Sequence, residues 1–128
     1  MTEHAGRVRL IYHMCLREEW ELAVKSGAYA GSSQDRADGF IHFSTAEQLP
    51  QSARRHRKGQ AGLVLLAVDP ELLSEALRWE PSRHGALFPH LYGTLPLSAV
   101  ISVCDMPLDA DGVPLSPPLG ASFHGYGS

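Results

Sequence analysis

The apolar run GLVLLAV at residues 62–68 is the most strand-like stretch of the chain and the strongest constraint on its fold. Asp69-Pro70-Glu71 directly after it has the order of a helix cap followed by proline at the first helical position. One helical turn is therefore predicted to follow this strand. Four further stretches have strand composition: residues 8–15 (VRLIYHMC), 40–43 (FIHF), 76–80 (ALRWE) and 99–104 (AVISVC).

The first predicted helix covers residues 16–25, directly after the strand at 8–15. Glutamates at positions 18, 19 and 21 face outward, and Gly27 is placed to end the helix. Trp20 is predicted to anchor this helix in the core, so that its truncation to alanine should cost about 3 to 5 kcal/mol. The predicted inward face consists of Leu16, Trp20, Ala23 and Val24.

A second helix is predicted to begin at Ser44 or Thr45, because the segment STAE at 44–47 fits a capping box. Pro50 breaks or restarts this helix before it ends at Lys58. The polar segment 31–39 (GSSQDRADG) and the segment 81–96, punctuated by glycine and proline, are predicted to be loops.

These elements predict a single mixed α+β domain over residues 1–106, with about five strands and two or three short helices. Residues 107–128 are rich in proline, glycine and serine without any period, which predicts an extended or disordered tail. Cys15 and Cys104 lie within predicted strands and have no C-x-x-C spacing, so both are predicted to be buried, reduced thiols.

The charge balance argues against polyanionic partners, because 14 acidic and 11 basic residues give a net charge of −3. We expect no DNA partner, while RNA stays open and nothing indicates an oligomeric state. Since no apolar run reaches the ~18 to 20 residues of a membrane span and the first residues lack the plan of a signal peptide, no membrane partner is expected and the protein is predicted to be cytoplasmic. The basic segment RRHRK at 54–58 is either a solvated helix end or a phosphate contact.

Three histidines occupy unusual places. His13 and His42 each interrupt an apolar strand, and His90 lies among aromatic residues, a proline and a glycine in the predicted loop LFPHLYG at 87–93. A histidine on an apolar strand face either bonds a backbone carbonyl in the core or serves a site. In the strand at 8–15, the alternation places His13 with Ile11 and Cys15, opposite Leu10, Tyr12 and Met14.

A zinc site is a natural question for three histidines, because zinc accepts three of them with an open fourth position. Metal sites commonly draw two ligands from one local motif such as H-x-x-x-H, and these histidines are far apart in the sequence. We therefore expect no metal. The chain also lacks the G-x-S-x-G elbow of serine hydrolases and the glycine-rich loops that bind phosphates.

The combination of IYHM at 11–14, Trp20, GAY at 27–29, DGFIHFST at 38–45 and FPHLYG at 88–93 resembles a small, mainly bacterial family catalogued as domain of unknown function nine hundred fifty-two. The resemblance covers roughly residues 8 to 105. It implies a fold similar to that of ADP-ribosyltransferases, which bind NAD in a cleft between two small sheets. A small, strongly bent or split, mostly antiparallel sheet is therefore expected.

The same resemblance implies a nucleotide site. His13 matches a superfamily histidine that contacts the nicotinamide ribose, and His42 with the residues after it matches a second motif, nearest to that of RNA 2′-phosphotransferases. No glutamate stands at an obvious third catalytic position, and the phosphate-gripping arginines have no clear counterpart. The expected catalytic residues are His13, His42 and His90, and the expected substrate-binding residues are Asp38, Phe40, Ser44, Thr45, Phe88 and Tyr92.

The leading hypothesis is a transferase-like domain that binds NAD, ADP-ribose or a related small-molecule nucleotide, with ADP-ribosyl- or 2′-phosphotransferase-like chemistry and NAD as the candidate cofactor. Neutral imidazoles can bond ribose hydroxyls, and the aromatic residues offer flat surface to a base. One alternative is a non-catalytic nucleotide-binding module that lost the third catalytic residue. Another is a metal-dependent hydrolase built on the three histidines.

Overall fold

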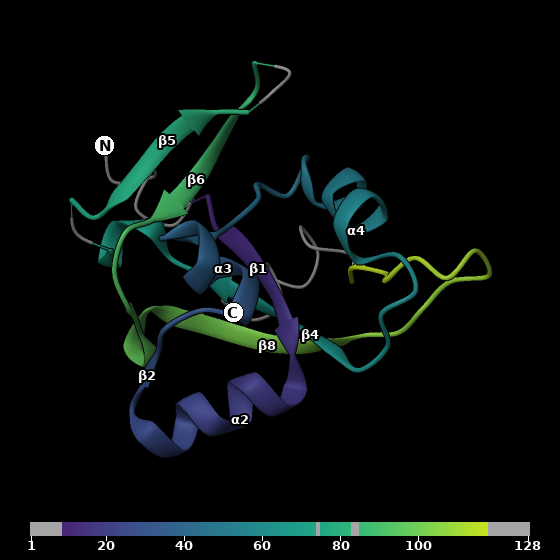
Figure 1. Ribbon diagram of the computed structural model, residues 1–128, viewed down its shortest axis with the longest axis horizontal. Coiled ribbons are helices and arrows are strands. Elements are labelled where there is room, and N and C mark those ends of the chain that lie inside the picture. Colours follow the sequence, from purple (N-terminus) through teal and green to yellow (C-terminus); the bar gives the residue numbers. More distant parts are fainter. Residues whose placement is uncertain (1–8, 74, 83–84, 118–128) are drawn as a thin grey trace.

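The computed structural model describes residues 9–73, 75–82 and 85–117. Three small antiparallel sheets lie within these ranges (Figure 1). The central sheet has the order β1-β4-β8, from β1 (Ile11–Leu16), β4 (Leu63–Val68) and β8 (Val100–Met106). A second sheet has the order β3-β6-β5, and a short pair joins β2 to β7. The prediction of a mixed α+β domain with a split antiparallel sheet is confirmed, whereas an ADP-ribosyltransferase-like fold stays a prediction.

The central sheet divides the core in two. All six residues of β4 are buried, because β1 and β8 flank the strand and both faces of the sheet are covered. Val64, Leu66 and Val68 belong to the larger core cluster, and Leu63, Leu65 and Ala67 to the smaller one on the other face. This double burial is why the strand reads as one continuous apolar run.

The predicted alternation along β1 is confirmed. Ile11 and Cys15 belong to the larger core cluster, and Tyr12 belongs to the smaller one, with Met14 packed against it. His13 points to the same side as Ile11 and Cys15, and its side chain is 2% exposed. The strand therefore brings an imidazole into the main core.

The segment 81–96, predicted to be a loop, instead contributes the central strand of the second sheet and one strand of the short pair. β6 (Leu87–Leu91) pairs with both β5 (Leu77–Pro81) and β3 (Ile41–His42), and β7 (Leu95–Pro96) pairs with β2 (Ala28–Tyr29). β6 was not predicted as a strand because it contains Pro89, and a proline usually argues against a central strand. Its carbonyl oxygen accepts a hydrogen bond from the Phe43 amide at 3.0 Å, so Pro89 still takes part in the sheet.

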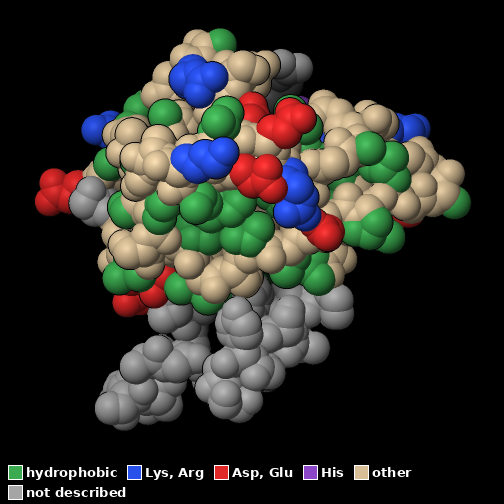
Figure 2. Space-filling model, turned by 90° about the horizontal axis from the view of Figure 1, so that it is seen from below, with side chains coloured by type: hydrophobic (Ala, Val, Ile, Leu, Met, Phe, Trp, Pro, Cys, Tyr) green, Lys and Arg blue, Asp and Glu red, His purple; other side chains and the backbone are tan. Residues whose placement is uncertain are grey.

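Helix α2 (Arg17–Ser26) lies across one end of the domain, at the bottom of Figure 1. Ala23 is buried, and Trp20 is partly buried against the larger core. The predicted inward face is wrong for Leu16 and Val24, which are 37% and 52% exposed. Figure 2 looks onto this side of the molecule, where hydrophobic side chains lie between charged ones.

The segment 31–39 is not a loop, because it contains helix α3 (Ser33–Asp38). Ser32 and Asp35 form a reciprocal capping box, in which each side chain accepts a hydrogen bond from the other residue's amide. Gly39 then ends the helix in the left-handed conformation, with φ of 90°. Six residues are too few to show a helical period, so the capping box was the available sequence signal.

Helix α4 (Leu49–Arg57) begins later than predicted, with Pro50 in its first turn. The side chain of Thr45 accepts from the Gln48 amide at 3.2 Å, and that of Gln48 accepts from the Thr45 amide at 3.0 Å. The predicted capping box is therefore displaced by one residue, and it closes a turn before the helix. Leu49 and Ala53 are buried.

Two short 3₁₀ turns, η1 (Pro70–Leu72) and η2 (Leu97–Ala99), complete the described elements. The predicted turn after β4 is thereby confirmed. The described part of the predicted tail, residues 107–117, contains an antiparallel bridge between Leu108 and Pro114, and residues 118–128 lie outside the described ranges. Cys15 is buried as predicted, but Cys104 is partly exposed because it lies on the edge strand β8. No helix in the described ranges is long and apolar enough to cross a membrane.

Candidate functional site

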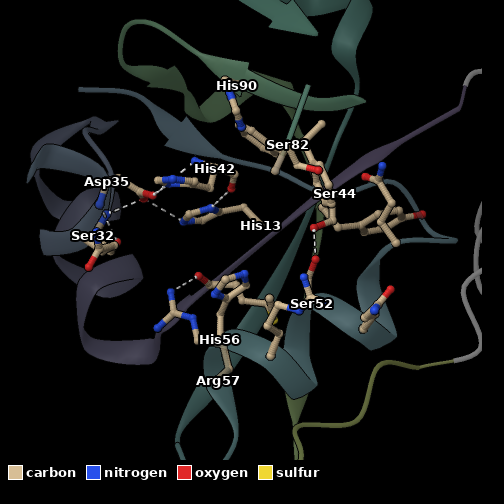
Figure 3. A pocket seen from close by; sticks show the side chains of 18 of the residues that line it. His13, Ser32, Asp35, His42, Ser44, Ser52, His56, Arg57, Ser82 and His90 are labelled. Atoms are coloured by element: carbon tan, nitrogen blue, oxygen red, sulfur yellow. Dashed lines mark hydrogen bonds and ion pairs between the residues drawn. The ribbon is translucent and has the colours of Figure 1, made fainter. Parts of the chain in front are cut away.

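A cleft of about 790 Å³ lies among β1, α3, β3, α4 and the β5–β6 hairpin (Figure 3). β1 contributes Tyr12, His13 and Met14 to its lining, and α4 contributes Gln51, Ser52, Arg55, His56 and Arg57. The cleft is therefore bounded by the central sheet, by the second sheet and by helices α3 and α4. Six of the predicted site residues line the cleft: His13, Asp38, His42, Ser44, Phe88 and His90.

Phe40, Thr45 and Tyr92 do not line the cleft, although they were expected to bind the substrate. The Phe40 ring stacks on His90, with centroids 4.1 Å apart and an interplanar angle of 26°. The Thr45 side chain accepts a hydrogen bond from the Gln48 amide in the turn before α4, and the Tyr92 hydroxyl donates one to Glu80 at 2.7 Å. Phe40 therefore contacts His90, and Tyr92 contacts Glu80, the carboxylate that also accepts a hydrogen bond from His90.

His42 is held by two carboxylates of α3. Its Nδ1 lies 2.6 Å from Asp35 Oδ1, and its Nε2 lies 3.1 Å from Asp38 Oδ2. Asp35 and Asp38 stand three residues apart, so that one side of this short helix presents both carboxylates to the ring. The Asp35 side chain is 4% exposed, whereas those of Asp38 and His42 are 39% and 40% exposed.

Asp35 is charged within the fold. Burial alone would raise its pKa, but hydrogen bonds from His42 and Ser32 and the nearby His13 ring outweigh burial and lower the pKa to about 2. The Ser32 amide donates to Oδ2 at 2.8 Å, and the His42 amide donates to Oδ1 at 3.2 Å. A buried carboxylate with this many donors gives His42 a rigid support.

His13 lies behind His42 and uses both ring nitrogens within the protein. Nδ1 is 2.6 Å from the His42 carbonyl oxygen, so this nitrogen carries the proton and donates. Nε2 is 2.7 Å from the Tyr29 hydroxyl, which donates to it. Burial lowers the pKa of His13, opposed by the Asp35 carboxylate 3.5 Å from Nε2 and by the hydrogen bond to the His42 carbonyl. Its contact with a ligand ribose stays a prediction.

His90 lies on β6 directly opposite His42 on β3, and the two ring centroids are 5.6 Å apart. Its Nδ1 donates to Glu80 Oε1 at 2.7 Å. This hydrogen bond lowers the pKa of Glu80. The pairing of β3 with β6 thus brings two imidazoles from distant parts of the sequence to one wall of the cleft, and each is held through Nδ1 by a carboxylate.

The opposite wall belongs to α4, whose basic segment was predicted to be either a solvated helix end or a phosphate contact. Arg55, His56 and Arg57 line the cleft, whereas Arg54 lines a separate hollow with Asp109. Burial, followed by the guanidinium group of Arg55, lowers the pKa of His56. Between the two walls, the Ser44 hydroxyl donates to that of Ser52 at 3.1 Å.

Asp35, Tyr29 and Glu80 were not among the predicted site residues, although each forms a hydrogen bond with a histidine of the site. The capping box at residues 32–35 was a local signal for Asp35. No local sequence signal pointed to Tyr29 or Glu80, because only the tertiary fold brings each of them to its histidine. Within the described ranges, no group of three or more histidine, cysteine or acidic residues is arranged to hold a metal ion.

A family model described as "Protein of unknown function (DUF952)" matches residues 14–103. A crystal structure of protein CC0527 from Caulobacter crescentus is 50% identical, with a TM-score of 0.82, and the match covers 90% of this chain and 98% of that one. A solution NMR structure of CC0527 is 51% identical, with a TM-score of 0.74, and covers 88% of this chain and 95% of that one. No curated protein is significantly similar to this chain.

Proposed function

Because this chain belongs to the family described as "Protein of unknown function (DUF952)", whose name assigns no activity, we propose a function from the cleft itself. The cleft binds a phosphorylated nucleotide of the NAD or ADP-ribose kind, and His42 acts on it as a proton donor or acceptor. An ADP-ribosyltransferase-like arrangement belongs to the same proposal. In its support, the cleft is lined by β1 of the central sheet and by β3 and β6 of the second sheet.

One observation carries the proposal. His42, held at Nδ1 by the buried Asp35, lies in a cleft that also contains the cations of α4. A carboxylate behind an imidazole orients the ring and stabilises the protonated form that arises when Nε2 takes a proton. In this cleft the group that exchanges the proton is a hydroxyl of the ligand, which replaces Asp38 at Nε2.

The size and lining of the cleft suit such a ligand. A volume of about 790 Å³ lies within the roughly 300 to 1,000 Å³ that is usual for small-molecule sites. Phe88 offers a flat apolar surface for a base, and the cations suit phosphates. NAD, when bound, supplies an activated bond between its ribose and nicotinamide.

A non-catalytic nucleotide-binding module is the second candidate. It is favoured by the 3.1 Å contact between His42 Nε2 and Asp38, because a nitrogen that keeps its own carboxylate has no ligand proton to exchange. The two candidates differ in turnover and share the binding site.

Thermal shift and calorimetry with NAD, ADP-ribose and nicotinamide test the binding, and chromatography of the NAD incubation tests turnover. A ligand at 100 times its Kd raises the free energy of unfolding by about 2.7 kcal/mol. We expect NAD or ADP-ribose to bind and His42→Ala to weaken the binding. Binding that survives His42→Ala unchanged would contradict the proposed site. Nicotinamide release by wild type, lost in His42→Ala, separates the enzyme from the binding module.

A further inference from the structure

The last turn of α4 places two guanidinium groups at the cleft. Arg55 and Arg57 both line it, together with His56. Arg57 donates to the Met14 carbonyl and to Gln60 Oε1, each at 2.9 Å, so its side chain is tied to β1 and to the residues after the helix. Cations suit the C-terminal turn of any helix through its dipole, but the dipole does not select the side on which they lie.

Neither guanidinium has a carboxylate partner among the described residues. Both oxygens that accept from Arg57 are neutral, and Arg55 forms no ion pair within the described ranges. The acidic residues of the cleft, Asp35 and Asp38, are paired with His42. Two full positive charges therefore remain uncompensated by the described part of the chain.

We propose that Arg55, His56 and Arg57 form a diphosphate site at the α4 end of the cleft, and that the ligand of this protein carries two adjacent phosphates. The proposal rests on the proposed function and names its substrate class as pyrophosphate-containing nucleotides. The pyrophosphate of a dinucleotide carries two negative charges, one for each guanidinium. Arg57 has three of its five N–H groups left to donate, and the exposed Arg55 is free to adapt to the second phosphate.

The site is tested by calorimetric titration of the full chain with inorganic pyrophosphate and inorganic phosphate at about 0.15 M salt, where distant surface charges are largely screened. We expect pyrophosphate to bind more tightly than phosphate. Arg55→Gln should weaken pyrophosphate binding about tenfold or more, because a charged hydrogen bond is lost. The matched control is Arg54→Gln, which removes the same charge from the adjacent residue outside the cleft and should change the Kd less than about twofold.

Equal losses in Arg54→Gln and Arg55→Gln would overturn the proposal, because binding would then follow net charge. Phosphate that binds as tightly as pyrophosphate would overturn it as well. Titration with ADP-ribose distinguishes a failure of the diphosphate site from a failure of the proposed function. Pyrophosphate binding that depends on Arg55, without any binding of ADP-ribose, supports the anion site and contradicts the nucleotide ligand. ADP-ribose binding that depends on His42 but not on Arg55 supports the nucleotide ligand and contradicts the diphosphate site.

Discussion

Asp35 and His42 are joined twice through one carboxylate oxygen. Asp35 Oδ1 accepts from the His42 ring at 2.6 Å and from the His42 backbone amide at 3.2 Å. The other oxygen accepts from the Ser32 amide and closes the first turn of α3. One buried carboxylate thus determines where the ring lies, where its strand lies and where the neighbouring helix begins.

Asp35→Asn should reduce the dependence of stability on pH. The pKa of Asp35 falls from 3.8 to about 2 on folding, so its contribution is complete above pH 3.8 and is lost as the pH falls through about 2. That contribution is on the order of 2 kcal/mol, which is the free-energy equivalent of the lowered pKa. Urea unfolding at several pH values between 6 and 2 should show a smaller decline for the variant. Parallel declines would contradict the assigned role of Asp35.

His13→Ala and His42→Ala should have opposite profiles. Removal of His13 deprives the buried Tyr29 hydroxyl of its acceptor and the His42 carbonyl of its donor, which should cost about 1 to 3 kcal/mol or more in stability. After His42→Ala, Asp35 keeps two backbone donors, so we expect a loss of about 1 kcal/mol in stability but more than about tenfold in affinity for ADP-ribose. Urea unfolding and calorimetry on both variants check this. A strongly destabilised His42→Ala with unchanged affinity would make His42 a residue of the fold.

Gly31→Ala should be more destabilising than Gly27→Ala. Both glycines have positive φ, 99° and 95°, so both substitutions carry a penalty of roughly 1 to 2 kcal/mol. A Cβ at Gly31 would lie 2.8 Å from Asp35 Cβ and 3.2 Å from Ile41 Cγ1, whereas nothing lies within 4 Å of one at Gly27. The clash should add about 1 to 3 kcal/mol, measured as the difference between the two unfolding free energies. Equal losses would show that Asp35 moves aside without cost.

Trp20→Ala should lower stability by about 2 to 3 kcal/mol, somewhat less than the value for a fully buried tryptophan. The ring is partly buried and meets Tyr29 edge to face, with centroids 6.3 Å apart. Trp79→Ala is the control, because Trp79 on β5 is 47% exposed, and it should cost less than about 1 kcal/mol. Thermal unfolding of both variants measures the contrast, and a larger loss for Trp79 would contradict it.

The α+β class, the central strands and the two-sided alternation of β1 were predictable because they depend on residues next to one another in the sequence. Apolar runs indicate buried segments, and a period of two indicates on which face of the sheet each side chain lies. The three histidines stood out for the same reason, since an ionisable ring in an apolar stretch is a local anomaly.

The sequence by itself determined which residue types are available for a site, and the tertiary structure decided which of them meet. β6 was hidden by Pro89, and its pairing with β3 places His90 opposite His42. The packing of α4 brings Arg55 and Arg57 to the cleft and leaves Arg54 outside it. These contacts join distant segments, and their energy depends on three-dimensional packing that no local pattern records.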